Sequence, residues 1–92
     1  MEKVLFTDQD AAGSAEFVAG AKTLLVLSGS PTGTIDVKDI ANPTATWETL
    51  ENGTVTAAVA KTLDQVPAGT LLRVNLTAAT DVYGHVRNDP PA

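Results

Sequence analysis

The sequence contains no cysteine, and this absence excludes both a disulfide framework and a metal site built on thiolates. No apolar run is longer than four residues, as at residues 24–27, whereas a membrane helix needs roughly 20. The first residues also lack the positive start and the unbroken apolar stretch of a signal peptide. We therefore expect a protein without a membrane partner that is not secreted through a signal peptide.

Positive side chains are few, since six lysines and arginines stand against 11 aspartates and glutamates, for a formal net charge of -5. A protein that binds the phosphate backbone needs a basic surface, so this balance argues against a nucleic-acid partner. Aromatic residues make up only 4% of the chain, yet hydrophobic residues reach 43%. The chain can therefore bury a mainly aliphatic core and fold as one ordered domain.

Groups suited to catalysis are also scarce, with one histidine and no cysteine. His85 could act as a base with Asp81 or Asp89, but its position on an expected terminal strand favours a surface histidine. The glycines and serines of residues 28–33 match neither a nucleophile elbow nor a phosphate loop, so a turn between strands explains them. We therefore expect a protein that is not an enzyme and that has no catalytic residue.

The residues that are abundant favour strands. Threonine and valine are common, and no interval shows the sustained apolar period of a helix. Turn residues recur at intervals of about ten residues, which is typical of a β-sandwich or a barrel. They stand at residues 29–33, 42–43, 52–53, 67–69 and 84.

The hydrophobic pattern predicts about seven short strands. Residues 22–28 are nearly continuously apolar and predict a central core strand. Leu72, Val74 and Leu76 alternate with polar residues and predict one buried face. The other expected strands cover residues 14–18, 34–40, 44–49, 54–59 and 81–87, with residues 52–53 as a hairpin turn.

These strands predict an all-β fold, an antiparallel β-sandwich that is immunoglobulin-like or jelly-roll-like. The sandwich domain is expected over residues 14–88. A flexible N-terminal arm is expected at residues 1–13, and a C-terminal tail at residues 89–92.

Two acidic clusters offer oxygen ligands for calcium, namely Asp8 with Asp10 and Asp36 with Asp39. Neither has the spacing of an EF-hand loop, and on a strand Asp36 and Asp39 face opposite sides. A solvated acidic surface is the favoured interpretation. We therefore expect no metal site and no cofactor.

The aromatic side chains leave two interpretations open. Trp47 and Tyr83 could form a platform for a carbohydrate or another ligand. In a small sandwich a single tryptophan more often fills the core, and we favour that interpretation for Trp47. Phe6 and Phe17 are expected to pack likewise or to anchor the arm.

Several segments together resemble a known group of proteins. They are Phe17, residues 20–26 with the pattern Thr-Leu-x-Val, residues 34–37, Trp47, and residues 67–74 with a Pro-Ala-Gly turn before a strand. This order resembles the small β-sandwich structural proteins encoded with the head and tail genes of tailed bacteriophages. The resemblance covers roughly residues 17–86.

The resemblance implies a non-enzymatic virion protein, made in the bacterial cytoplasm and placed on the outer capsid surface as a decoration (cement) protein. Its implied partners are the major capsid protein of the assembled shell and, at threefold positions, two further copies in a homotrimer. If residues 1–14 form a free arm, Val4, Leu5 and Phe6 are the first candidates for an apolar anchor on a neighbour. A frayed terminus without a role is the other interpretation.

A second function remains open, a ligand-binding or carbohydrate-binding module of a phage head or tail fibre. Such a module is expected to use its loop tips, here residues 29–33 and 41–46. Tryptophan fluorescence that changes with added sugars distinguishes it from a decoration protein, which is expected to bind assembled shells.

Overall fold

The computed structural model describes residues 2–38, 44, 46–63 and 66–88. These residues form strands and no helix. The strands are β1 (Glu2–Gln9), β2 (Gly13–Val18), β3 (Thr23–Lys38), β4 (Trp47–Val55), β5 (Val59–Thr62) and β6 (Leu71–Asn88). All their pairings are antiparallel, and they join the six strands into one sheet. The all-β antiparallel class expected from the sequence is confirmed.

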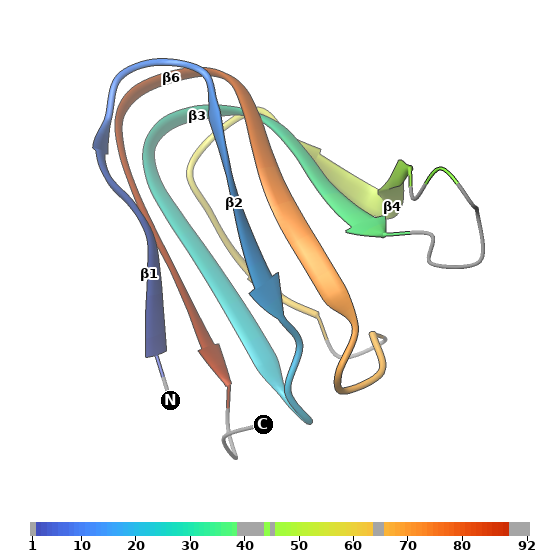
Figure 1. Ribbon diagram of the computed structural model, residues 1–92. Coiled ribbons are helices and arrows are strands. Elements are labelled where there is room, and N and C mark those ends of the chain that lie inside the picture. The colour runs from blue at the N-terminus through green and yellow to red at the C-terminus, as the bar shows by residue number, and fades with distance from the viewer. Residues whose placement is uncertain (1, 39–43, 45, 64–65, 89–92) are drawn as a thin grey trace.

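Two long strands, β3 and β6, form the centre of this sheet. Their ladder runs from Thr23 opposite Asn88 to Val37 opposite Leu72. Both strands bend about halfway along, so the sheet folds over in two limbs (Figure 1). The first limb contains β1, β5, the first half of β3 and the second half of β6. The second limb contains β2, β4 and the remaining halves of β3 and β6.

Left-handed backbone conformations mark the bend in three neighbouring strands. Asp8 of β1, Gly29 of β3 and Asp81 of β6 have φ angles of 48°, 83° and 51°. The β3–β6 ladder shifts register at the same level, between Ser28 and Ser30, as a β-bulge does. A Cβ atom at Gly29 would lie 2.2 Å from the carbonyl oxygen of Asp81, so only glycine fits there. The bulges therefore turn β3 and β6 without ending them, whereas β1 ends at Gln9.

The bend changes the strand count expected from the sequence. Residues 29–33, predicted as a turn between two strands, lie inside β3, where Pro31 is buried. Residues 52–53, predicted as a hairpin turn, lie inside β4, and Asn52 has a φ angle of 59°. The two strands expected around residues 72–76 and 81–87 are likewise one strand, β6. Three pairs of expected strands thus merge into β3, β4 and β6, because bulges use the same glycines and prolines that are typical of turns. With β2, and with β1 and β5, which the pattern does not predict, the described chain has six strands. The end of the strand expected at residues 34–40 lies outside the described residues.

The N-terminal segment is a strand of the sheet, which corrects the expectation of a flexible arm. β1 pairs with β6 from Glu2 opposite Arg87 to Gln9 opposite Val82. Phe6 is buried in the core. Burial of this ring and the backbone ladder to β6 both favour the ordered strand over a solvated arm. The C-terminal tail expected at residues 89–92 lies outside the described residues.

The hydrophobic core draws its side chains from both limbs. Along β6, Leu72, Val74 and Leu76 are buried and alternate with more exposed neighbours, as the sequence predicts. The same strand repeats this pattern in the first limb with Val82 and Val86. The other buried apolar side chains are Phe6, Phe17, Ala19, Leu25, Leu27, Ile35, Val55, Leu63 and Val66. Burial of this shared core holds the two limbs together.

Candidate protein-interaction face

The outer side of β3 in the first limb is apolar. Leu25 and Leu27 are buried in the core, so Leu24 and Val26 point to the opposite side of the sheet and are only partly buried. A strand that is apolar on both sides is typical of a sheet covered on both faces. Here the chain itself covers one face, and the other is accessible.

Neighbouring strands extend this apolar surface across the first limb. Val4 of β1 lies opposite His85 of β6, His85 opposite Val26, and Val26 opposite Ala60 of β5. Residues directly opposite each other in a ladder point to the same side, so these four form one row. Val4 is 68% exposed and Tyr83, on the same side of β6, is 50% exposed. We call this surface the apolar face, and its members are Val4, Leu24, Val26, Ala60, Tyr83 and His85.

One end of the apolar face carries a pair of opposite charges. Glu2 lies opposite Arg87, which in turn lies opposite Leu24. The Arg87 Nη1 and Glu2 Oε1 atoms are 3.6 Å apart, and both side chains are more than half exposed. Such an exposed pair contributes less than about 1 kcal/mol to stability. The pair therefore brings both signs of charge to this end of the face, and its own two charges cancel.

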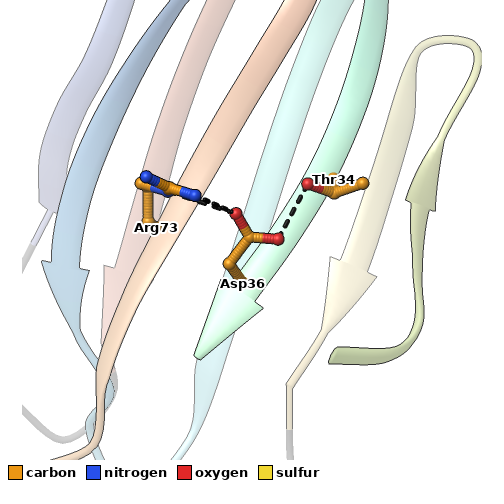
Figure 2. Close-up of polar contacts among 3 residues, drawn as sticks. All are labelled: Thr34, Asp36 and Arg73. Carbon is orange, nitrogen blue, oxygen red and sulfur yellow. Dashed lines mark hydrogen bonds and ion pairs between the residues drawn. The ribbon is translucent and has the colours of Figure 1, made fainter. Parts of the chain in front are cut away.

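The outer side of the second limb is mostly polar, although Val18 of β2 is 46% exposed. Arg73 of β6 donates from Nη2 and Nε to Oδ2 of Asp36, at 2.6 and 3.1 Å, as Figure 2 shows for this cluster. The Thr34 hydroxyl donates to the other carboxylate oxygen, Oδ1, at 2.7 Å. Asp36 is only 4% exposed, and both of its carboxylate oxygens are satisfied. This network is a structural ion pair that ties β3 to β6.

Trp47 lies beside this network and not in the core, which corrects the favoured expectation. It pairs with Lys38 in the β3–β4 ladder and is partly exposed. The Arg73 guanidinium carbon lies 4.6 Å from the ring centroid, and the Lys38 Nζ atom lies 5.1 Å from it. Both distances are within cation–π range. The ring therefore already serves as a partner for two cations of its own chain.

Three carboxylates meet at the bend. Oxygen atoms of Asp8, Asp10 and Asp81 lie within 4.8 Å of one another, and all three residues are exposed. Asp10 Oδ1 accepts a hydrogen bond from the backbone N–H of Asp81 at 2.8 Å. Repulsion from Asp10, and then from Asp8, raises the pKa of Asp81. These are oxygen ligands that calcium prefers, but exposed acidic groups are common without an ion, and we assign no metal here.

The sequence identified only part of this acidic group. Asp8 and Asp10 are two residues apart in the chain, whereas Asp81 joins them through the β1–β6 pairing. In the other acidic pair considered from the sequence, Asp36 is paired with Arg73. Asp39 lies outside the described residues.

Lysines bridge the two limbs at both edges of the sheet. Lys3 of β1 donates from Nζ to the carbonyl oxygen of Glu16 in β2, at 2.8 Å. At the other edge Lys61 of β5 donates to the carbonyl oxygen of Asn52 in β4. A cleft of about 460 Å³ lies beside the second bridge. Its lining residues are Leu50, Glu51, Asn52, Lys61, Thr62, Leu63 and Val66.

The three residues proposed as an apolar anchor all lie in β1, but their side chains have different surroundings. Val4 is exposed on the apolar face, Leu5 packs partly against the core, and Phe6 is buried. Only Val4 is therefore fully available to a partner in this structure. The sequence places His85 on the outer side of its strand, and the buried Val86 beside it agrees with this placement.

The sequence pattern does not predict the apolar face. Residues 22–28 predicted a core strand, and nothing in their pattern indicates that only one of the two sides is covered by the chain. Of the two loop regions considered for ligand binding, residues 29–33 form part of the bend in β3. The other, residues 41–46, lies mostly outside the described residues.

Comparisons of the chain with protein-family models, with curated proteins and with solved structures give no match. The part of the chain that the structure describes contains no helix with the length and hydropathy that a bilayer crossing requires.

Proposed function

We propose that this chain is a non-enzymatic structural protein of a virion, a decoration protein that binds the outside of an assembled phage head and stabilises it. The observation that supports a role in protein contacts is the apolar face, where Leu24, Val26, Val4 and Tyr83 lie on the outer side of an ordered sheet. Exposed apolar patches on soluble proteins commonly mark interaction sites. The resemblance of the sequence to phage structural proteins supplies the virion part of the proposal.

The two-layered fold suits a small protein that lies between neighbouring capsomers. We interpret the two limbs as the two layers of a β-sandwich, in which the bent strands β3 and β6 each supply one strand to each layer. The shared core and the Asp36–Arg73 pair support this interpretation. A decoration protein adds contact area between neighbouring capsomers, so its effect comes from burial repeated over many copies.

The proposed partners are the major capsid protein of the assembled shell and further copies of this chain, as in a homotrimer at threefold positions. Neither nucleic acid nor membrane belongs to the proposal, because a chain with a formal charge of -5 is repelled by phosphate backbones.

A sedimentation experiment tests the proposal. The purified chain is mixed with shells assembled from a phage major capsid protein, and in parallel with unassembled subunits of the same capsid protein. We expect it to sediment with the shells, to remain in solution with the subunits, and to raise the temperature at which the shells disassemble. Absence of shell binding at saturating concentration contradicts the decoration role.

The alternative, a carbohydrate-binding module, rests on the partly exposed Trp47. Since Arg73 and Lys38 already lie over this ring, a sugar has to displace at least one cation in order to stack on it. Trp47 is the only tryptophan in the chain. A titration with mono- and oligosaccharides followed by its fluorescence therefore tests this function directly, and a saturable change favours it over the decoration role.

A further inference from the structure

We infer that copies of this chain pack against one another through the apolar face of the first limb. The inference rests on the proposed function only in that the chain acts through protein contacts. It assigns the surface and the occupant, which that proposal leaves open.

The edges of the sheet are poorly suited to association. A free edge strand pairs with another chain through its unpaired backbone groups, and proteins block this with bulges and inward-pointing charges. β1 has register shifts between Val4 and Phe6 and again between Phe6 and Gln9. Lys3 occupies the Glu16 carbonyl of β2 on this edge. On the opposite edge Lys61 occupies the Asn52 carbonyl of β4. Strand addition at either edge has to displace a lysine.

The apolar face offers a different route, through side chains. Leu24 and Val26 lie in the middle of a four-stranded surface, with Val4 and Ala60 in the same row as Val26. No bulge separates Leu24 from Leu27 in the ladder between β3 and β6. A regular sheet with apolar centre and polar ends is the kind of surface that packs face to face on another sheet.

The charges indicate which partner fits this face. Glu2 contributes -1 and Arg87 contributes +1, so the charges of this pair sum to zero. The whole formal charge of -5 therefore comes from the remaining residues. Two copies of an acidic protein repel each other least where the surface is neutral. At this pair, therefore, two identical acidic chains meet no local excess of negative charge.

The same two charges are complementary to themselves. In a symmetric contact each copy presents the same patch, so Glu2 of one chain can lie near Arg87 of the next. A partner with a strongly charged surface of one sign finds no complement on this face. We therefore commit to a second copy of this chain as the occupant, because a contact in which the same face packs on itself closes with two copies.

Light scattering coupled to size-exclusion chromatography tests the inference on the wild-type chain and on three variants. We expect the wild type to elute with a mass of twice the 9.5 kDa of the chain. Val26→Lys places a charge at the centre of the face and is expected to weaken association at least about tenfold, since a buried unpaired charge is costly. Val4→Lys repeats the test at a side chain that is 68% exposed and therefore tolerates substitution.

Ser14→Lys is the matched control, because Ser14 is exposed on β2 in the second limb and the substitution adds the same charge. It is expected to keep the wild-type mass. Circular dichroism and thermal melts test whether each variant is folded. If Val26→Lys does not fold, Val4→Lys alone tests the inference. A monomeric wild type at millimolar concentration overturns the inference, as does an oligomer that survives Val4→Lys or that Ser14→Lys also dissociates.

Shell binding is measured separately on the same proteins. A monomer that still sediments with shells leaves the decoration role standing and removes self-association through this face. A chain that forms the oligomer but does not bind shells supports the inference and contradicts the decoration role.

Discussion

The outer faces of the two limbs differ in composition although the same two central strands build both. Before the bend, β3 places Leu24 and Val26 on its outer side, and after the bend it places Thr34 and Asp36 there. The inner side of β3 is buried and mostly apolar in both limbs. The inner pattern therefore specifies the fold, whereas the outer pattern divides the molecule into an apolar surface and a polar one.

The two faces also differ in how they use opposite charges. Asp36 and Arg73 on the polar side are largely buried, with 5% and 24% of their side chains exposed. Glu2 and Arg87 beside the apolar face are more than half exposed and 3.6 Å apart. One pair holds strands together, and the other leaves its charges available to a neighbour.

Substitution of Gly29 by alanine is expected to have the largest effect, because Gly29 lies at the bend that separates the two limbs. The new Cβ atom would overlap the Asp81 carbonyl, and the φ angle of 83° is itself unfavourable for alanine. We expect a loss of about 3–4 kcal/mol in the free energy of unfolding, measured by urea titration.

Gly69→Ala is the matched control for this prediction. Gly69 has a φ angle of 90°, but no atom lies within 4 Å of the position of its Cβ. It is expected to lose only about 1 kcal/mol from backbone strain. Equal losses at the two positions contradict the role of the close approach at the bend.

Asp36→Ala comes next and tests the polar limb. It leaves the Arg73 guanidinium without its carboxylate in a site that is mostly buried, so we expect a loss of about 2–3 kcal/mol. Glu2→Ala removes the corresponding acid on the apolar limb and is expected to cost less than about 1 kcal/mol. Chemical denaturation of both variants measures the difference, and the interpretation of the two pairs fails if Glu2→Ala is the more damaging.

Lys3→Met is expected to have a smaller effect on stability and a visible effect on association. It removes the ammonium group that occupies the Glu16 carbonyl, at a cost below about 1 kcal/mol. The freed edge of β2 is then open to strand addition. We expect faster aggregation on heating, followed by light scattering. Lys22→Met removes the same charge from an exposed position and should aggregate as the wild type does.

Asp81→Asn is expected to have the smallest effect and the opposite sign. The folded state raises the pKa of Asp81, so it binds this proton more readily than the unfolded chain does. Stability therefore falls as the pH rises through the raised pKa, and the full penalty is present at neutral pH. The variant should melt at a higher temperature than the wild type at pH 7. This gain should vanish below about pH 3.9, the ordinary pKa of aspartate, and a gain that persists there excludes charge repulsion as its cause.

The sequence predicts the buried side of each strand better than the course of the strands. Alternation at Leu72, Val74 and Leu76 needs only the two-residue period of a strand, and the burial pattern confirms it. The bend depends on left-handed conformations at Asp8 and Asp81. An aspartate in the sequence does not indicate this conformation, because aspartate is common both in turns and on solvated strands.

The candidate site was harder to predict, because its members come from distant parts of the chain. Val4 and His85 are brought together with Val26 by pairing of β1, β6 and β3. The same holds for Asp36 and Arg73, which are 37 residues apart. Local patterns indicate which side a residue faces, but the identity of its cross-strand neighbour requires the register of strands that are far apart in sequence.

The central position of β6 also has a consequence for synthesis of the chain. β1 and β2 both pair with β6, and so does β3 along nearly its whole length. A ribosome makes β6 after all of these strands, so each emerges before its main partner exists. The apolar segment of β3 is then exposed on both sides during translation, and the sheet can close only after β6 has left the exit tunnel. Chaperones that hold extended apolar segments are therefore expected to act on this small protein while it is still being made.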